Sequence, residues 1–203
     1  MVTQNQTRLT RRVPVISLML IGPALVIYIF PGLHPVLVYD RSAVLNGQFW
    51  RLVTGQWVHF SMSHLGYDIL TFGIAGWMIE SRGYAKFGWL CGVAPPTIGI
   101  GLLALEPRLE IYGGLSGMAT AAVVFLTLHG LGETGAWRWI CLTILIATSG
   151  KILFESLTGR FVFLKPDDPS LVLVPAGHII GALTALAVFA WSKVQKGALS
   201  KDK

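Results

Sequence analysis

The sequence is dominated by apolar runs that are nearly long enough, or long enough, to cross a lipid bilayer. A transmembrane helix needs about 20 residues, and six runs of roughly 16 to 22 residues approach or exceed that length. Only 13% of the 203 residues are charged, whereas about 25% is usual in soluble domains. We therefore predict an all-α polytopic membrane protein with six transmembrane helices. The expected helices cover residues 13–30, 63–79, 84–105, 115–131, 137–154 and 176–191.

A chain of this length leaves no room for a separate soluble module, so we expect one membrane domain over residues 1–203. Short basic tails are expected at residues 1–12 and 193–203. The net charge of +6 comes from basic residues that cluster near the termini. This placement indicates contact with lipid headgroups and argues against a nucleic-acid partner. Residues 31–62 are expected in the membrane interface, and residues 165–169 in an exposed loop.

The positions of Lys and Arg predict an orientation. Six crossings would put both termini on one side, and that side would hold ten of the 16 Lys and Arg residues. Because basic loops are retained in the cytoplasm, we expect cytoplasmic termini. The second, fourth and sixth helices would then start at the outer surface. His64, Ser116 and His178 stand at those three starts and are therefore expected at one depth.

Two pairs of glycines four residues apart flank the most reactive side chains. One pair is Gly113 and Gly117, around Ser116, and the other is Gly177 and Gly181, around His178. Small residues at this spacing allow two helix backbones in lipid to approach closely. A serine hydroxyl becomes a nucleophile when a base removes its proton, and histidine titrates near neutral pH. We therefore predict that Ser116 is the nucleophile and His178 the general base.

Further polar residues stand near the same expected surface. His64 and Asp68 are four apart and share a helix face, so His64 could donate to an oxyanion. Asp68 could hold the His64 ring, or donate as a neutral acid, or repel an oxyanion if it is ionised. Lys151 and Glu155 are also four apart and are interpreted as an ion pair. His59 is interpreted as an interfacial histidine. No cofactor or metal is expected.

These residues resemble motifs of the rhomboid family of intramembrane serine proteases, in the family's order and on the expected helices. The resemblance runs from about residue 47 to the end of the sixth helix. The matching segments are Gly47-Gln48-Phe49-Trp50-Arg51-Leu52, His59 to His64 followed by Asp68, Glu80-Ser81-Arg82, Gly114-Leu115-Ser116-Gly117 and Gly177-His178-Ile179-Ile180-Gly181.

The resemblance implies a rhomboid-like bundle and a Ser–His dyad without a third carboxylate. Ser116 would attack a peptide carbonyl in a transmembrane or juxtamembrane segment, forming an acyl-enzyme that water cleaves. His64, Asp68 and Leu115 would form or orient the oxyanion site. Asp68 departs from the family pattern, which has Asn there, and Thr120 stands where many rhomboids have Tyr. The second and fifth helices would gate lateral access from lipid.

The short chain, Asp68 and the segment around Lys151 and Glu155 are most similar to the rhombosortase branch. That similarity implies substrates with a C-terminal Gly-Gly, an apolar span and a basic tail. It also implies a bacterial inner membrane location, with the site toward the outer side.

Two alternatives remain open from sequence. One is an inactive rhomboid-like protein that binds membrane clients without cleaving them. The other is a proton-coupled transporter with His64, Asp68 and His178 as a relay, although no inverted repeat is visible.

Overall fold

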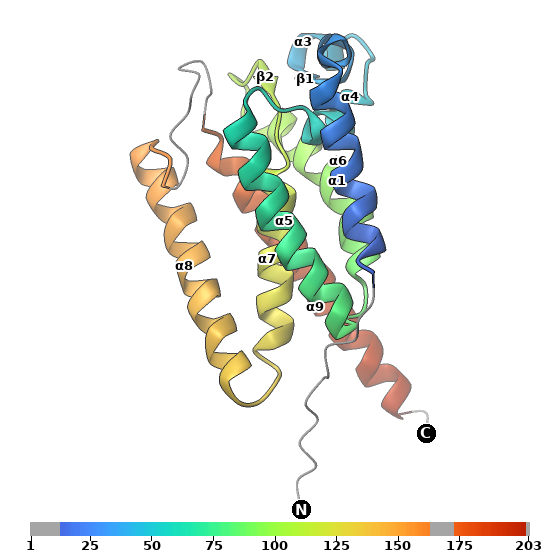
Figure 1. Ribbon diagram of the computed structural model, residues 1–203, viewed down its shortest axis with the longest axis vertical. Coiled ribbons are helices and arrows are strands. Elements are labelled where there is room, and N and C mark those ends of the chain that lie inside the picture. The colour runs from blue at the N-terminus through green and yellow to red at the C-terminus, as the bar shows by residue number, and fades with distance from the viewer. Residues whose placement is uncertain (1–12, 163–172, 202–203) are drawn as a thin grey trace, which may run out of the picture.

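The computed structural model describes residues 13–162 and 173–201 and shows six long helices that alternate in direction (Figure 1). All six helices that the sequence predicts are present near their expected positions. The expected loop at residues 165–169 and the basic tail at residues 1–12 lie outside the described residues. The long helices are α1 (Val15–Ile29), α5 (Met62–Arg82), α6 (Phe87–Leu105), α7 (Ser116–Gly130), α8 (Ala136–Thr158) and α9 (Pro175–Lys201).

Length and hydropathy identify fewer crossings than six among the described residues. Three helices, α6, α8 and α9, are long and apolar enough to cross a membrane, and α1 joined to its bent continuation makes up to four. Helix α7 is apolar but has 15 residues, which corresponds to about 22 Å. Helix α5 is 21 residues long but contains Asp68, Glu80 and Arg82. The structure therefore establishes a multi-helix bundle with at least three membrane-compatible spans.

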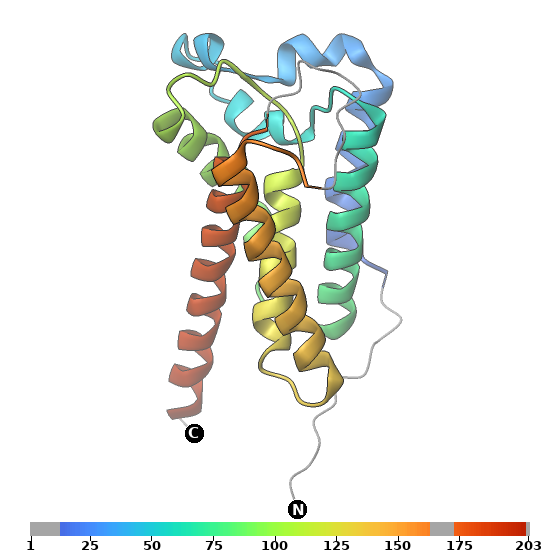
Figure 2. The same ribbon diagram turned by 90° about the vertical axis from the view of Figure 1, so that its left-hand side faces the viewer.

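Short elements cover the end of the bundle at which α5, α7 and α9 begin (Figures 1 and 2). The strands of this cap pair antiparallel, with Tyr39 opposite Tyr112. Arg51 is buried and donates hydrogen bonds to the backbone oxygens of Val38 and Pro35, both at 2.8 Å. The short elements are η1 (Pro31–Leu33), α2 (His34–Leu37), β1 (Tyr39–Asp40), α3 (Arg41–Leu45), α4 (Arg51–Thr54), η2 (Gly55–Trp57) and β2 (Ile111–Tyr112).

The opposite end of the bundle is joined by charged groups. Glu80, near the end of α5, accepts hydrogen bonds from the backbone N–H groups of Ile16 and Ser17 at 3.0 and 2.9 Å. These donors belong to the first turn of α1 and have no partner within their own helix. Arg82 forms an ion pair with Glu133 at 2.7 Å. The carboxylate of Glu80 thus fastens the start of α1 to α5.

Helix α7 forms the centre of the bundle. Ten of its 15 residues are buried, including Met118, Ala122 and Phe125. Its neighbours include α5, α8 and α9. Because α7 is enclosed, the side chain at its first residue, Ser116, lies beneath the cap rather than at the outside of the molecule. Helix α9 continues to Lys201, ten residues beyond the predicted end of its apolar run.

Candidate active site

Glycines bring the starts of α7 and α9 together. A Cβ atom added at Gly117 would lie 3.0 Å from the backbone oxygen of Gly177. A Cβ atom added at Gly181 would overlap the backbone oxygen of Gly117 and lie 3.0 Å from its carbonyl carbon. The close helix approach predicted from the glycine spacing is therefore confirmed at Gly117 and Gly181, whereas a Cβ atom added at Gly177 would meet the ring of Tyr112. Gly113 instead packs against the cap, beside the backbone oxygen of Val58.

One cavity of about 710 Å³ connects the predicted site residues. Ser116, His178, His64 and Asp68 all line it, so the three helix starts meet as the sequence indicates. Leu115 is fully buried and is not part of the cavity lining. The cavity also extends between α5 and α8. Its further lining on those two helices includes Tyr67, Thr71, Ile144, Ala147, Thr148, Lys151 and Glu155.

Ser116 is partly exposed at the first position of α7, and its side chain lies near the hydroxyl of Tyr112. Burial raises the pKa of Tyr112 far above its ordinary value, and the negative charge of Asp68 raises it further. Tyr112 therefore remains a neutral phenol, whose hydroxyl donates to the backbone oxygen of Gly114 at 3.4 Å. Within the described residues, no hydrogen bond joins Ser116 directly to His178. Catalytic hydrogen bonds are often long in an empty site and shorten when substrate binds.

His178 is held by a carboxylate from a different helix. Its Nδ1 lies 3.1 Å from Oε2 of Glu155, and only 6% of His178 and 2% of Glu155 is exposed. The same oxygen accepts a hydrogen bond from Lys151 Nζ at 2.7 Å. The ion pair predicted between Lys151 and Glu155 is therefore present. Its contact with His178 is the part that sequence reasoning missed.

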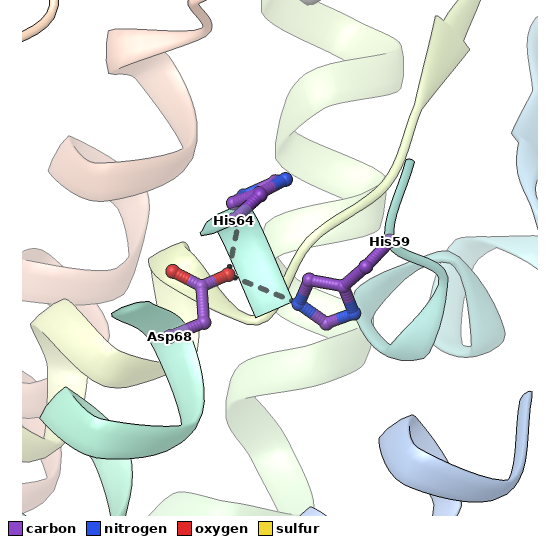
Figure 3. A group of neighbouring side chains, drawn as sticks. All are labelled: His59, His64 and Asp68. Carbon is purple, nitrogen blue, oxygen red and sulfur yellow. Dashed lines mark hydrogen bonds and ion pairs between the residues drawn. The ribbon is translucent and has the colours of Figure 1, made fainter. Parts of the chain in front are cut away.

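A second cluster is centred on Asp68 (Figure 3). The Nε2 atoms of His59 and His64 both approach Oδ2 of Asp68, at 3.1 and 3.2 Å. The rings of the two histidines lie 5.0 Å apart. The contact expected between His64 and Asp68 is confirmed. His59, interpreted from sequence as an interfacial residue, is instead completely buried.

This cluster offers two imidazole nitrogens and a carboxylate oxygen, which are donor types that bind transition metals. The three ligand atoms lie within 4.8 Å of one another. However, Nε2 of His59 also lies 3.2 Å from the backbone nitrogen of Leu115. This ring nitrogen either carries a proton and donates it to Asp68, or has a lone pair and accepts from the Leu115 N–H, so in both states it is engaged within the protein. We therefore assign His59, His64 and Asp68 to hydrogen bonding.

The loop before Ser116 is shaped by the same cluster. The φ angle of Gly114 is +138°, which L side chains rarely adopt, and an added Cβ would lie 2.6 Å from Cε1 of His64. The N–H of Leu115 faces Nε2 of His59 at 3.2 Å, which joins the loop to this cluster. The part expected of Leu115 in the oxyanion site stays a prediction.

The residues that sequence reasoning missed are His59, Tyr112 and Glu155 as members of the site. His59 precedes a helix rather than lying in one, and Tyr112 stands in the cap, so neither has a helical spacing that relates it to Ser116. Glu155 carried a usable signal, because an acidic residue inside an apolar run is functional by default. Its local pairing with Lys151 offered a sufficient explanation without His178.

Comparisons with known proteins identify the family of the chain. A family model described as the Rhomboid domain matches residues 46–195, which contain every site residue described above. A search of curated proteins found no match. The matched region covers well over half of the chain and includes α6, α8 and most of α9, the three helices that are long and apolar enough to cross a membrane. The chain is therefore a multi-pass membrane protein that belongs to the rhomboid family, whose members are intramembrane serine proteases.

Proposed function

We propose that this protein is an intramembrane serine endopeptidase in which Ser116 is the nucleophile and His178 the general base. The observation that carries the proposal is the shared cavity. Both side chains line it, on helices that glycines hold in contact. The cavity also contains the polar groups that acyl transfer needs, within an otherwise apolar bundle.

The proposed reaction follows the chemistry of serine hydrolases. As His178 removes the hydroxyl proton, Ser116 Oγ attacks the carbonyl carbon of the scissile peptide bond. The imidazolium then gives this proton to the leaving amine as the C–N bond breaks. Water, deprotonated by the same base, hydrolyses the acyl-enzyme and restores Ser116.

The oxyanion would be stabilised at the start of α7. The first hydrogen bond along this helix joins Ala119 N–H to the oxygen of Leu115. The preceding N–H groups, at Ser116, Gly117 and Met118, have no acceptor within the helix and form the positive end of its dipole. Developing negative charge near Ser116 would meet these donors.

His64 can support this role when it carries two protons. In that state one N–H faces Asp68, and the Nδ1–H is free for the oxyanion. Nδ1 of His64 has no protein partner among the described residues. Oδ2 of Asp68 lies 3.2 Å from Nε2 of His64, where it can accept that N–H and hold the ring in this orientation. This interpretation gives a function to Asp68, the residue that departs from the family's Asn.

The test is covalent labelling of the protein by a fluorophosphonate probe in detergent or vesicles. We expect wild-type protein to be labelled and Ser116→Ala to be unlabelled, because only an activated serine reacts. The matched control is Ser149→Ala, which removes an exposed serine from α8 outside the cavity lining. Equal labelling of wild type and Ser116→Ala would refute the proposal.

The proposed substrates carry a C-terminal Gly-Gly, an apolar span and a basic tail. The cavity between α5 and α8 is lined by both helices, which supports lateral access of such a span. Two reporters, one with Gly-Gly and one with Val-Val before the same span, would be co-expressed with wild type or Ser116→Ala. If wild type cleaved both reporters at equal rates, the proposed Gly-Gly specificity would be refuted, but the proposed protease activity would stand.

We further propose that the protein lies in a bacterial inner membrane, with cytoplasmic termini and with the site toward the outer side. The distribution of Lys and Arg supports this orientation. A membrane-impermeant thiol reagent applied to intact cells provides the test, with single cysteines placed in a cysteine-free background. Labelling at Asn46 in the cap, and its absence at Glu133, is the expected result. Labelling at Glu133 and not at Asn46 would show the opposite orientation and refute this part of the proposal.

One observation favours a second candidate, a protein that binds membrane clients without cleaving them. No hydrogen bond joins Ser116 to His178 among the described residues, and the Ser116 side chain lies near Tyr112 instead. If this arrangement persisted with substrate, the serine would remain unactivated. The second candidate predicts that Ser116→Ala captures a client as well as wild type and that neither reacts with the fluorophosphonate.

A further inference from the structure

The contact between Glu155 and His178 joins two helices at their cavity-facing surfaces. The two residues are 23 positions apart in sequence, and Nδ1 of His178 lies 3.1 Å from Oε2 of Glu155. Both side chains are almost completely buried and line the cavity that contains Ser116. Since Nδ1 faces a carboxylate, the natural arrangement is an Nδ1–H donor, which leaves Nε2 with its lone pair.

Burial makes this position of Glu155 costly unless it is paired. Of the 23 residues in α8, only Cys141 and Glu155 are buried. A buried carboxylate requires charged or hydrogen-bonding partners. Glu155 has Lys151 at 2.7 Å and His178 at 3.1 Å on Oε2, and the backbone N–H of Val162 at 3.5 Å on Oε1. An ion pair that served only to neutralise Lys151 could remain at the exposed surface of α8.

We propose that Glu155 is the positioning carboxylate of the active site, making the arrangement Ser116–His178–Glu155, and that Lys151 moderates its charge. This proposal rests on the proposed protease function. Glu155 fixes the tautomer in which Nε2 can accept the Ser116 proton. When that proton moves to Nε2, the imidazolium is stabilised by the adjacent carboxylate, which itself stays ionised. The proton then passes to the leaving amine, so Glu155 neither gains nor loses one.

Other charged groups near the cavity do not replace this contact. Asp68 is on α5 and is engaged by His59 and His64. Tyr112, from the cap, is neutral and donates to the backbone oxygen of Gly114. Arg108 and Glu110 line the cavity from the segment between α6 and β2. Among the described residues, Glu155 is the carboxylate within hydrogen-bonding distance of His178.

The first experiment measures cleavage rates against pH for two variants whose effects have opposite signs. In Glu155→Gln the imidazolium loses its counter-charge, so we expect the acid limb of the kcat profile to move to lower pH. We also expect kcat to fall by about 10²- to 10⁴-fold, with KM changed by less than about twofold. In Lys151→Met the carboxylate is no longer shared, so the acid limb should move to higher pH.

The matched control is Glu106→Gln, which removes a carboxylate at the end of α6 outside the cavity lining. It should leave both kcat and the acid limb unchanged. A purely structural Glu155 would lower the yield or thermal stability of Glu155→Gln without moving the acid limb. Unchanged kcat and an unchanged acid limb in Glu155→Gln would overturn the proposal.

A second experiment does not depend on activity. Nitrogen NMR of protein with labelled histidines reports which ring nitrogen carries the proton, and the signal of His178 is assigned by its loss in His178→Asn. We expect the Nδ1–H tautomer in wild type and its loss or mixing in Glu155→Gln. An Nε2–H tautomer in wild type would overturn the positioning role. If the Nδ1–H tautomer is found but no Ser116-dependent reaction occurs, the protease function fails while the role of Glu155 in orienting His178 stands.

Discussion

The contact between α7 and α9 makes a sharp prediction about Gly181. In Gly181→Ala the new methyl carbon would lie 3.0 Å from the carbonyl carbon of Gly117 and would overlap its oxygen. Carbon atoms in contact prefer separations of about 3.5–4.0 Å. Backbone atoms cannot rotate away as a side chain can, and the overlap with the oxygen is the larger one, so the two helices must separate by about 1 Å.

This separation acts directly on the proposed site. Ser116 precedes Gly117 on α7, and His178 is one turn from Gly181 on α9. A displacement of about 1 Å in a catalytic pair can reduce the rate about 10²-fold. Overpacking in a filled core costs about 1–3 kcal/mol of stability. We therefore expect Gly181→Ala to lose about 10²-fold in the rate of fluorophosphonate labelling and to unfold at a lower temperature.

The control for Gly181→Ala is Gly92→Ala. Gly92 is on α6, and an added Cβ would meet no atom within 4 Å. Alanine favours helix over glycine, so this variant should keep its labelling rate and gain up to about 1 kcal/mol in stability. Both quantities are measured by thermal unfolding in detergent and by the time course of labelling. If Gly181→Ala behaved like Gly92→Ala in both assays, the close approach of α7 and α9 would not be required for activity.

Two further predictions concern parts of the structure away from His178. Glu80→Ala should lower stability by about 1–3 kcal/mol, because the first turn of α1 loses the acceptor of its N–H groups; thermal unfolding that matches wild type would contradict this role. The pKa of Tyr112 is raised in the folded state above its ordinary value of 10.0. The neutral phenol therefore stabilises the fold below about pH 10, and this contribution is lost as pH rises further. Tyr112→Phe should show a smaller loss of thermal stability between pH 9 and 11.5 than wild type, and an identical pH dependence would refute the assignment.

The long helices could be predicted because their signal is local. An apolar run in a chain with few charges has few ways to satisfy its backbone other than a helix, and all six runs are helical. Their ends were less predictable. Helix α9 continues past its apolar run to Lys201 because Lys, Gln and Ala are themselves good helix formers. Hydropathy marks where lipid contact ends, which is not where the helix ends.

The proximity of Ser116 and His178 could also be predicted, because glycines at fixed spacing mark the helix faces that approach each other. The residues that contact this pair and its neighbours could not be predicted. Glu155 reaches His178 only through the packing of α8 against its neighbours, and the segment between these residues gives no register for that contact. His59 has no helical spacing to Asp68, yet the cap places its ring 3.1 Å from the carboxylate. Such contacts are set by tertiary packing rather than by any periodic pattern.

The attachment of α8 connects these observations. Its two buried residues lie near its opposite ends, with Cys141 against Gly130 and Glu155 against His178. Between them, Ile144, Ala147 and Thr148 face the cavity rather than a packed core. If α8 moved away from the bundle at its Glu155 end, the contact with His178 would be lost. A substrate that displaced this end would meet a base without its positioning carboxylate, so catalysis would require α8 to return. In that case the placement of Glu155 on α8 would link closure of the cavity to orientation of the proposed base.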